Sequence, residues 1–288
     1  MRQIFTCGCA LLLTACAETS QERVQVPFEV AGTAPAGAIV ALGDVPVTLT
    51  RADLAFGPLY LCAGTQAGEL CETARLEWLD SVVVDALDAT PQPAGDLYGV
   101  SGSVQSWMYD LAISAQLTQR EPVVLEAAEA LGGYSLVLEG SAVVSGVTLP
   151  FVAEVPVQQT SATELGVPVV RKSQTDEFFH DVTGAEQALQ LRFDPATWLA
   201  SMDLRSYVEF ETCAPEQAGV VCDGLVEWTC VPGEAGTSRD CSATSDVCVA
   251  GVGCADHVTI SPTSEAFRAL RNALTAGARP EFVWVAAE

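Results

Sequence analysis

Short stretches in which apolar and polar residues alternate recur along most of the chain. In residues 24–30, for example, Val24, Val26, Phe28 and Val30 alternate with polar or small residues. A period of two predicts strands with one buried face. The clearest hairpin joins residues 134–144 to residues 147–157 through a turn at Ser145-Gly146. Further strands are expected at residues 45–50, 54–62, 79–87, 98–109, 167–171, 189–193, 207–210, 258–260 and 282–285.

Three stretches have helical periodicity, at residues 121–131, 195–201 and 263–276. The first ends at Gly132-Gly133, and the second begins at Asp194-Pro195, where an acidic N-cap precedes a proline of the first turn. Residues 92–95 contain proline and glycine and predict a turn. We therefore expect a mainly β protein, an antiparallel β-sandwich over residues 24–288 with a few short helices and a disulfide-rich insertion.

The chain has 11 cysteines: Cys7, Cys9 and Cys16 lie in the first 16 residues, and the other eight form two groups that differ in spacing. Cys62 and Cys71 flank a glycine-containing loop and are expected to pair with each other. Residues 213–254, the Cys-rich insertion, hold six cysteines and few aliphatic residues, so disulfides must stabilise this segment. Spacing leaves all fifteen pairings open, and the absence of C-x2-C or C-x4-C spacing after residue 16 disfavours zinc. The six are Cys213, Cys222, Cys230, Cys241, Cys248 and Cys254.

The chain begins with Arg2, an apolar run over residues 4–13 and small residues before Cys16. This layout is typical of a secretory signal peptide and is too short to span a bilayer. Leu13-Thr14-Ala15-Cys16 resembles the bacterial lipobox. The resemblance implies cleavage after residue 15, lipidation of Cys16, residues 16–23 as a tether and, because Ala17 is not an aspartate, sorting to the outer membrane. The alternative is an ordinary secretory signal peptide cut after Ala15 or Ala17.

The net charge of the protein limits the partners that it can bind. The net charge is −24, and Lys172 is the only lysine. A surface this acidic, without a basic stripe, repels phosphate backbones, so we expect no nucleic-acid partner. The expected partners are the membrane, through the lipid on Cys16, and an envelope protein.

Residues 176–181 form the best polar group for metal binding. On a helix Asp176 and His180 would share a face, and carboxylates with an imidazole suit a divalent ion, so Asp176, His180 and Asp181 are the candidate ligands. His257 is the only other histidine, which excludes a site of three histidines. We otherwise expect no cofactor. Asp80, Asp85 and Asp88 offer oxygen ligands for calcium, but their spacing is not that of an EF-hand.

Two family resemblances accompany these motifs. Cys222-Asp223-Gly224, Asp240-Cys241 and Gly253-Cys254 resemble the small Cys-rich repeat of exported lipoproteins of myxobacterial type, a Gram-negative group without an assigned activity. Similarity to periplasmic copper-associated β-sandwich lipoproteins would point to Trp107, Met108 and His180. Copper(I) sites usually have several thioether ligands, which favours packing roles for Met108 and Trp107 instead.

Common catalytic motifs are absent from the sequence: there is no G-x-S-x-G, H-E-x-x-H, phosphate-binding loop or S-x-x-K. We therefore expect an envelope lipoprotein that acts as a binding or structural module without catalysis, with the Cys-rich insertion as its contact surface. The alternatives are a periplasmic protein that binds copper or another divalent ion, and a secreted-type hydrolase.

Overall fold

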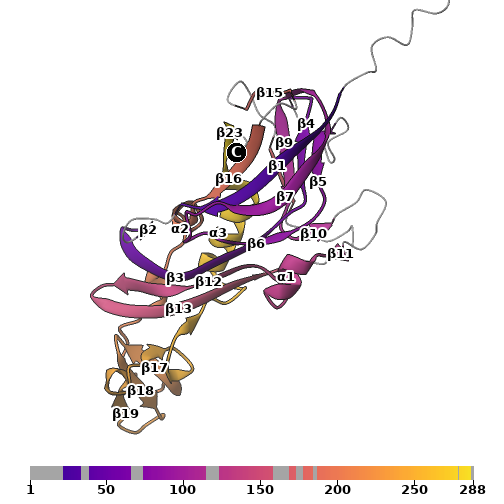
Figure 1. Ribbon diagram of the computed structural model, residues 1–288. Helices are drawn as coiled ribbons and strands as arrows, with labels where there is room; N and C mark the ends of the chain where they lie inside the picture. Colours follow the sequence, from indigo (N-terminus) through magenta and orange to yellow (C-terminus); the bar gives the residue numbers. More distant parts are fainter. Residues whose placement is uncertain are drawn as a thin grey trace, which may run out of the picture.

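A computed structural model describes residues 22–33, 39–65, 74–114, 123–157, 169–172, 178–183, 187–277 and 279–286. Strands predominate among them, and the two largest β-sheets pack face to face (Figure 1), which confirms the expected mainly β fold. Among these residues no helix is both long and apolar enough to cross a membrane.

The larger sheet has eight strands and curls strongly. Although β9 and β23 are far apart in the sheet order, the rings of Trp107 on β9 and Phe282 on β23 lie 4.9 Å apart. The curl brings the two ends of the sheet together. The strands follow the order β14 (Val169–Lys172), β9 (Ser106–Asp110), β4 (Leu59–Cys62), β5 (Ala74–Trp78), β7 (Gln92–Val100), β1 (Arg23–Gly32), β16 (Gln187–Phe193) and β23 (Glu281–Ala286).

The smaller sheet is built around the predicted hairpin, which turns at Ser145 and Gly146, both with positive φ. Its order is β2 (Ile39–Ala41), β3 (Val45–Phe56), β12 (Tyr134–Val144), β13 (Val147–Pro156) and β22 (Val258–Thr259), with β6 (Val82–Asp85) also paired to β3. Most pairs in both sheets are antiparallel, while β1 with β16 and β13 with β22 are parallel. Two short pairs lie outside these sheets: β8 (Gly102–Val104) with β15 (His180–Val182), and β10 (Ile113–Ser114) with β11 (Val123–Val124).

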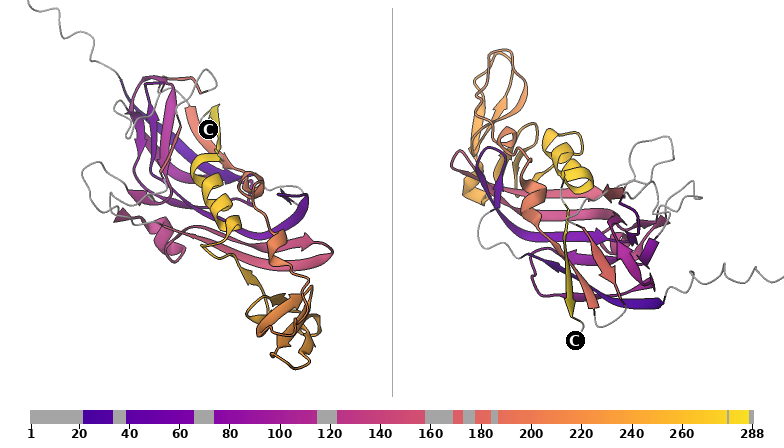
Figure 2. Two further views of the ribbon diagram at one scale, coloured as in Figure 1. Left: turned by 180° about the vertical axis from the view of Figure 1, so that it is seen from behind. Right: turned by 90° about the horizontal axis from the view of Figure 1, so that it is seen from above.

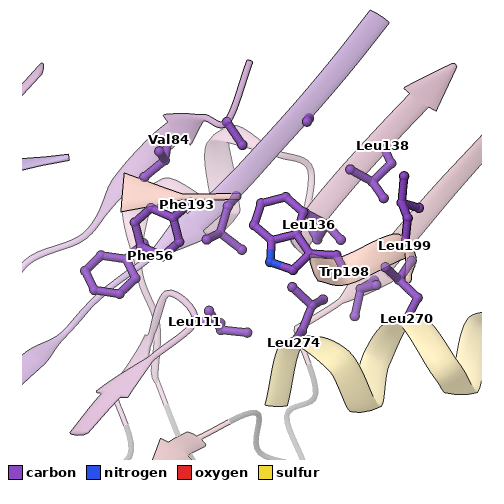
Figure 3. Close-up of a cluster of buried hydrophobic side chains, with 14 of the residues drawn as sticks. Phe56, Val84, Leu111, Leu136, Leu138, Phe193, Trp198, Leu199, Leu270 and Leu274 are labelled. Atoms are coloured by element: carbon purple, nitrogen blue, oxygen red, sulfur yellow. The ribbon is translucent and has the colours of Figure 1, made fainter. Parts of the chain in front are cut away.

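The core fills the space between the sheets. Phe56 is fully buried and contacts the rings of Phe28, Trp78, Tyr109 and Phe193 at centroid distances of 5.0–6.3 Å. The helices α2 (Pro195–Leu199) and α3 (Glu265–Asn272) add Trp198, Leu199, Leu270 and Leu274 to the same core (Figure 3); Leu274 lies in the π-helical turn Ala273–Gly277 that continues α3. As expected, the Asp194 carboxylate accepts a hydrogen bond from Ala196 N–H at the start of α2, at 2.9 Å.

Several expected boundaries are wrong for identifiable reasons. The strand at 45–50 continues to Phe56, and a new strand starts only after Gly57-Pro58. Residues 92–95 belong to β7, because a bulge against β1 accommodates the extra residue there. The expected strand at 207–210 is replaced by the 3-10 turn Arg205–Tyr207 and one isolated bridge at Phe210. In the first expected helix only α1 (Glu126–Ala130) is helical, after β11.

The Cys-rich insertion forms a small unit at one end of the molecule. It contains the antiparallel strands β17 (Gly219–Asp223), β18 (Val226–Cys230) and β19 (Thr237–Asp240), and the pair β20 (Val247–Val249) and β21 (Gly253–Ala255); the 3-10 turn Cys241–Thr244 joins the two groups. In all views this unit and the start of β1 at Arg23 lie at opposite ends of the molecule (Figures 1 and 2).

Candidate functional site

His180 lies where the two ends of the curled sheet meet. It is the first residue of β15, and its ring stacks on Trp284 of β23 with centroids 3.9 Å apart and planes 5° apart. Next to it, Phe178 contacts the rings of Trp107 and Phe282. Stacking on Trp284 therefore fixes the orientation of the imidazole.

Burial keeps this imidazole neutral at neutral pH. Desolvation lowers the pKa of His180 below its usual value of 6.5, and the smaller effects of Gln187 and Asp181 oppose this shift. Nε2 of His180 and Oε1 of Gln187 are both buried, and within the described part of the chain neither makes a hydrogen bond of good geometry, although the Gln187 side chain lies close enough to raise the pKa of His180 slightly. A buried unpaired polar atom costs about 1–3 kcal/mol, so a bound group that contacts Nε2 would recover this cost.

Of the other expected ligands, Asp181 does not join His180. Because residues 180–182 form a strand and not a helix, Asp181 points away from the His180 ring and is exposed. Asp176 lies outside the described residues, as do Cys16 and Cys71. His257 is far along the chain, and its Nδ1 lies 2.8 Å from Asp256. The described residues therefore supply one imidazole ligand here, with the Gln187 amide beside it.

The other residues considered as metal ligands or as part of a copper site, three aspartates, Trp107 and Met108, have local structural roles. The carboxylates of Asp80, Asp85 and Asp88 each accept a backbone hydrogen bond of 2.8 Å from a residue one or two positions later. They therefore stabilise turns. Trp107 and Met108 are both buried, with 2% and 1% exposure, and Trp107 stacks on Tyr109.

Three disulfides connect the Cys-rich insertion, which selects one pairing of the fifteen. Cys213 pairs with Cys230, Cys222 with Cys248, and Cys241 with Cys254. The insertion's own buried cluster consists of cysteines alone, so cross-links replace the apolar core that this segment lacks. Cys62 is also disulfide-bonded, and its expected partner is the Cys71 outside the described residues.

Glu227 lies beside the third of these disulfides. Its carboxylate accepts the N–H of Cys254 at 3.0 Å, and one of its oxygens lies within 4.8 Å of the sulfur atoms of Cys241 and Cys254. Among the described residues these three form the one group whose ligand atoms are close enough to hold a metal ion. Because both sulfurs are in a disulfide, they are not thiolate ligands.

The insertion exposes apolar side chains at the end that faces away from the two sheets. The β17–β18 turn lies against the β12–β13 hairpin, because a Cβ on Gly224 would be 3.9 Å from Val147. At the other end of the β17–β18 ladder Gly219 pairs with Cys230, and Val231 follows with 45% exposure. The Gly251 N–H bonds to the Val220 carbonyl at this end, which places Val252, 70% exposed, nearby. We call Val231 and Val252 the tip residues.

The sequence did not indicate a second feature, a hollow of about 590 Å³ on the outer face of β5 and β7. Its lining includes Glu77, Asp96 and Tyr98. The alternation of residues 96–100 could have predicted that Asp96 and Tyr98 lie on the same face of a strand. The interpretation of residues 92–95 as a turn, with the next strand starting at residue 98, left Asp96 out of that strand.

Comparisons with known proteins give little guidance. No family model matches the chain, and no curated protein matches it. A solved structure, MbnP from Methylosinus trichosporium, aligns over 93% of this chain and 99% of its own, with 12% identity and a TM-score of 0.33. Similarity this low establishes neither a common fold nor a common function.

Proposed function

We propose that this protein is an exported binding protein that is anchored to the outer membrane through Cys16 and contacts an envelope protein with its Cys-rich insertion. The observation that carries the proposal is the position of the insertion at the end of the molecule opposite Arg23. The protein then acts by presenting a surface, without catalysis.

The anchor fixes the orientation. Arg23 is the seventh residue after Cys16, and an extended chain spans at most about 3.5 Å per residue, so Arg23 lies within about 25 Å of the lipid attachment point. The Arg23 end of the sandwich then faces the membrane. The insertion points away from it, where a second protein has free access.

The insertion has the properties of a contact surface. Disulfides hold it rigid, which lowers the entropy cost of binding. The tip residues supply exposed apolar area, while six acidic residues against Arg239 alone make the surroundings negative. An apolar centre with a charged rim is the usual arrangement of a protein interface. We expect the partner to present an apolar patch bordered by basic residues.

The test replaces both tip residues, as Val231→Glu with Val252→Glu. Detergent-extracted complexes from the producing cells are compared by native mass spectrometry with those of a Val40→Glu control, which changes a valine of β2 whose exposure, 56%, lies between those of the two tip residues. We expect a defined complex with the wild type and the control, and its loss from the tip variant, with all disulfides intact. An unchanged complex in the tip variant would remove the insertion as the contact surface.

A second function, metal binding, is favoured by one observation. The neutral, buried Nε2 of His180 makes no hydrogen bond of good geometry in the described residues, and neither does the Gln187 Oε1 beside it. Imidazole nitrogen suits copper and zinc. We expect a His180→Ala variant to lose stoichiometric Cu²⁺ or Zn²⁺ binding in native mass spectra while His257→Ala keeps it. Equal binding by both variants would exclude His180 as a ligand.

A further inference from the structure

We propose that the hollow on the outer face of β5 and β7 binds a short peptide segment that carries an arginine or lysine side chain. This site lies on the sandwich, away from the Cys-rich insertion, and is independent of the function proposed above.

Strand pairing assembles the wall of the hollow. Glu77 of β5 pairs with Tyr98 of β7, so the two side chains are neighbours on the outer face. Asp96 lies two residues before Tyr98 and shares that face. Leu79 and Asp80 follow directly after β5 and complete the rim.

The floor is formed by Trp78 below Gly95. Trp78 is only 5% exposed, and a Cβ added to Gly95 would lie 3.3 Å from its Nε1 atom, so the missing side chain leaves this edge of the indole open to the hollow. Gly95 has a φ of 127°, a conformation that disfavours any residue with a Cβ. Within the described part of the chain, the Trp78 Nε1–H is not among the buried polar atoms that lack a partner, so this donor is open to solvent in the hollow. A carbonyl oxygen of a ligand can take the place of water there.

The rim selects a cation. Glu77, Asp80 and Asp96 line the hollow, and no lysine or arginine does. Among the described residues these three carboxylates make no ion pair with a basic side chain. A guanidinium or ammonium group placed between them would be stabilised by all three charges.

The apolar side chains at the rim favour a cation that is carried on a methylene chain, as in arginine and lysine. Tyr98 and Leu79 are 59% and 57% exposed. They would cover the methylene stem of an arginine or lysine, and the tyrosine ring also attracts the cation itself. The Trp78 N–H can donate to a carbonyl near the cation, which a peptide backbone provides and a simple polyamine lacks. The volume of about 590 Å³ exceeds one side chain and suits a short segment.

The test uses the indole N–H of Trp78 as its readout in ¹⁵N–¹H spectra, assigned with a Trp78→Phe variant. The probe is the blocked peptide acetyl-Gly-Arg-Gly-Arg-amide, titrated at physiological salt. We expect a saturable shift of the Trp78 indole resonance, and no shift with the peptide in which uncharged citrulline replaces arginine. Glu77→Gln with Asp96→Asn should weaken binding about fivefold to tenfold, as expected for the loss of two exposed ion pairs.

The control removes two charges elsewhere. Glu216→Gln with Glu234→Gln changes two exposed acids of the Cys-rich insertion and should leave the affinity unchanged, because charges far apart are screened beyond about 8 Å. Equal weakening in both double variants would show attraction to the whole acidic protein and overturn the site. An absent Trp78 shift, a shift with the citrulline peptide, or an equal shift with spermidine would each overturn the proposed peptide ligand.

Discussion

Replacing Cys222 and Cys248 with alanine should unfold the Cys-rich insertion and leave the two-sheet domain folded. This disulfide closes a loop of 26 residues, the longest of the three. Loop-closure entropy assigns it about 3.5 kcal/mol. A unit as small as the insertion rarely has more than about 3–5 kcal/mol of stability in total. Its buried cluster is made of cysteines, so the substitution also removes part of its core.

Hydrogen exchange followed by mass spectrometry resolves the two parts. Peptides that cover β17 and β18 should exchange at nearly the unfolded rate in the variant, while peptides that cover β12 and β13 keep wild-type protection. The core of the sheets, which includes Phe56 and Leu138, does not depend on these two cysteines, and this is the reason for the difference. Retained protection in β17 and β18, or its loss in all four strands together, would refute the view that disulfides alone hold the insertion.

Three further predictions concern the core, the buried histidine and the anchor. Phe56→Ala should lower the free energy of unfolding by about 3–5 kcal/mol, measured with urea, because Phe56 contacts four aromatic rings; a loss under about 1 kcal/mol would contradict this packing. Because burial lowers the pKa of His180 below 6.5, the unfolded chain binds more protons as the pH falls through that value, so stability should decline below about pH 6.5. The free energy of unfolding of His180→Gln, measured with urea, should fall less below pH 6.5 than that of the wild type, whereas His257→Gln should behave as the wild type. The same pH dependence in both variants would contradict the partial burial of His180 as its cause. Cys16→Ser should release the protein from the membrane fraction, and a variant that stays there as the wild type does would contradict lipid anchoring at Cys16.

The sequence predicted much of the fold because one-sided burial has a period of two. The β12–β13 hairpin and the strands around Phe28 and Leu191 were found in this way. The pairing of β1 with β16 was not accessible, since it joins residues about 160 positions apart and no local pattern encodes it. The curl that brings Trp107 to Phe282 could not be predicted for the same reason, because it depends on contacts between strands that are far apart in the sequence.

The candidate site was harder to predict because side-chain direction depends on the local backbone. A helix would have placed Asp176 and His180 on one face. The observed strand instead directs His180 toward Trp284 and leaves Asp181 exposed. Likewise the proline and glycine of residues 92–95 were interpreted as a turn, although a bulge keeps them in β7. The cysteine pairing required the tertiary fold, because spacing leaves all fifteen combinations open.

Site-specific photocrosslinking tests the central claim most directly. A photoreactive residue replaces Val252 at the exposed tip, and a matched protein carries it at Val40 of the sandwich. In the producing cells we predict one crosslinked species of defined mass from position 252 and none from position 40. The same species from both positions, or crosslinks from position 40 alone, would contradict a partner contact at the Cys-rich insertion.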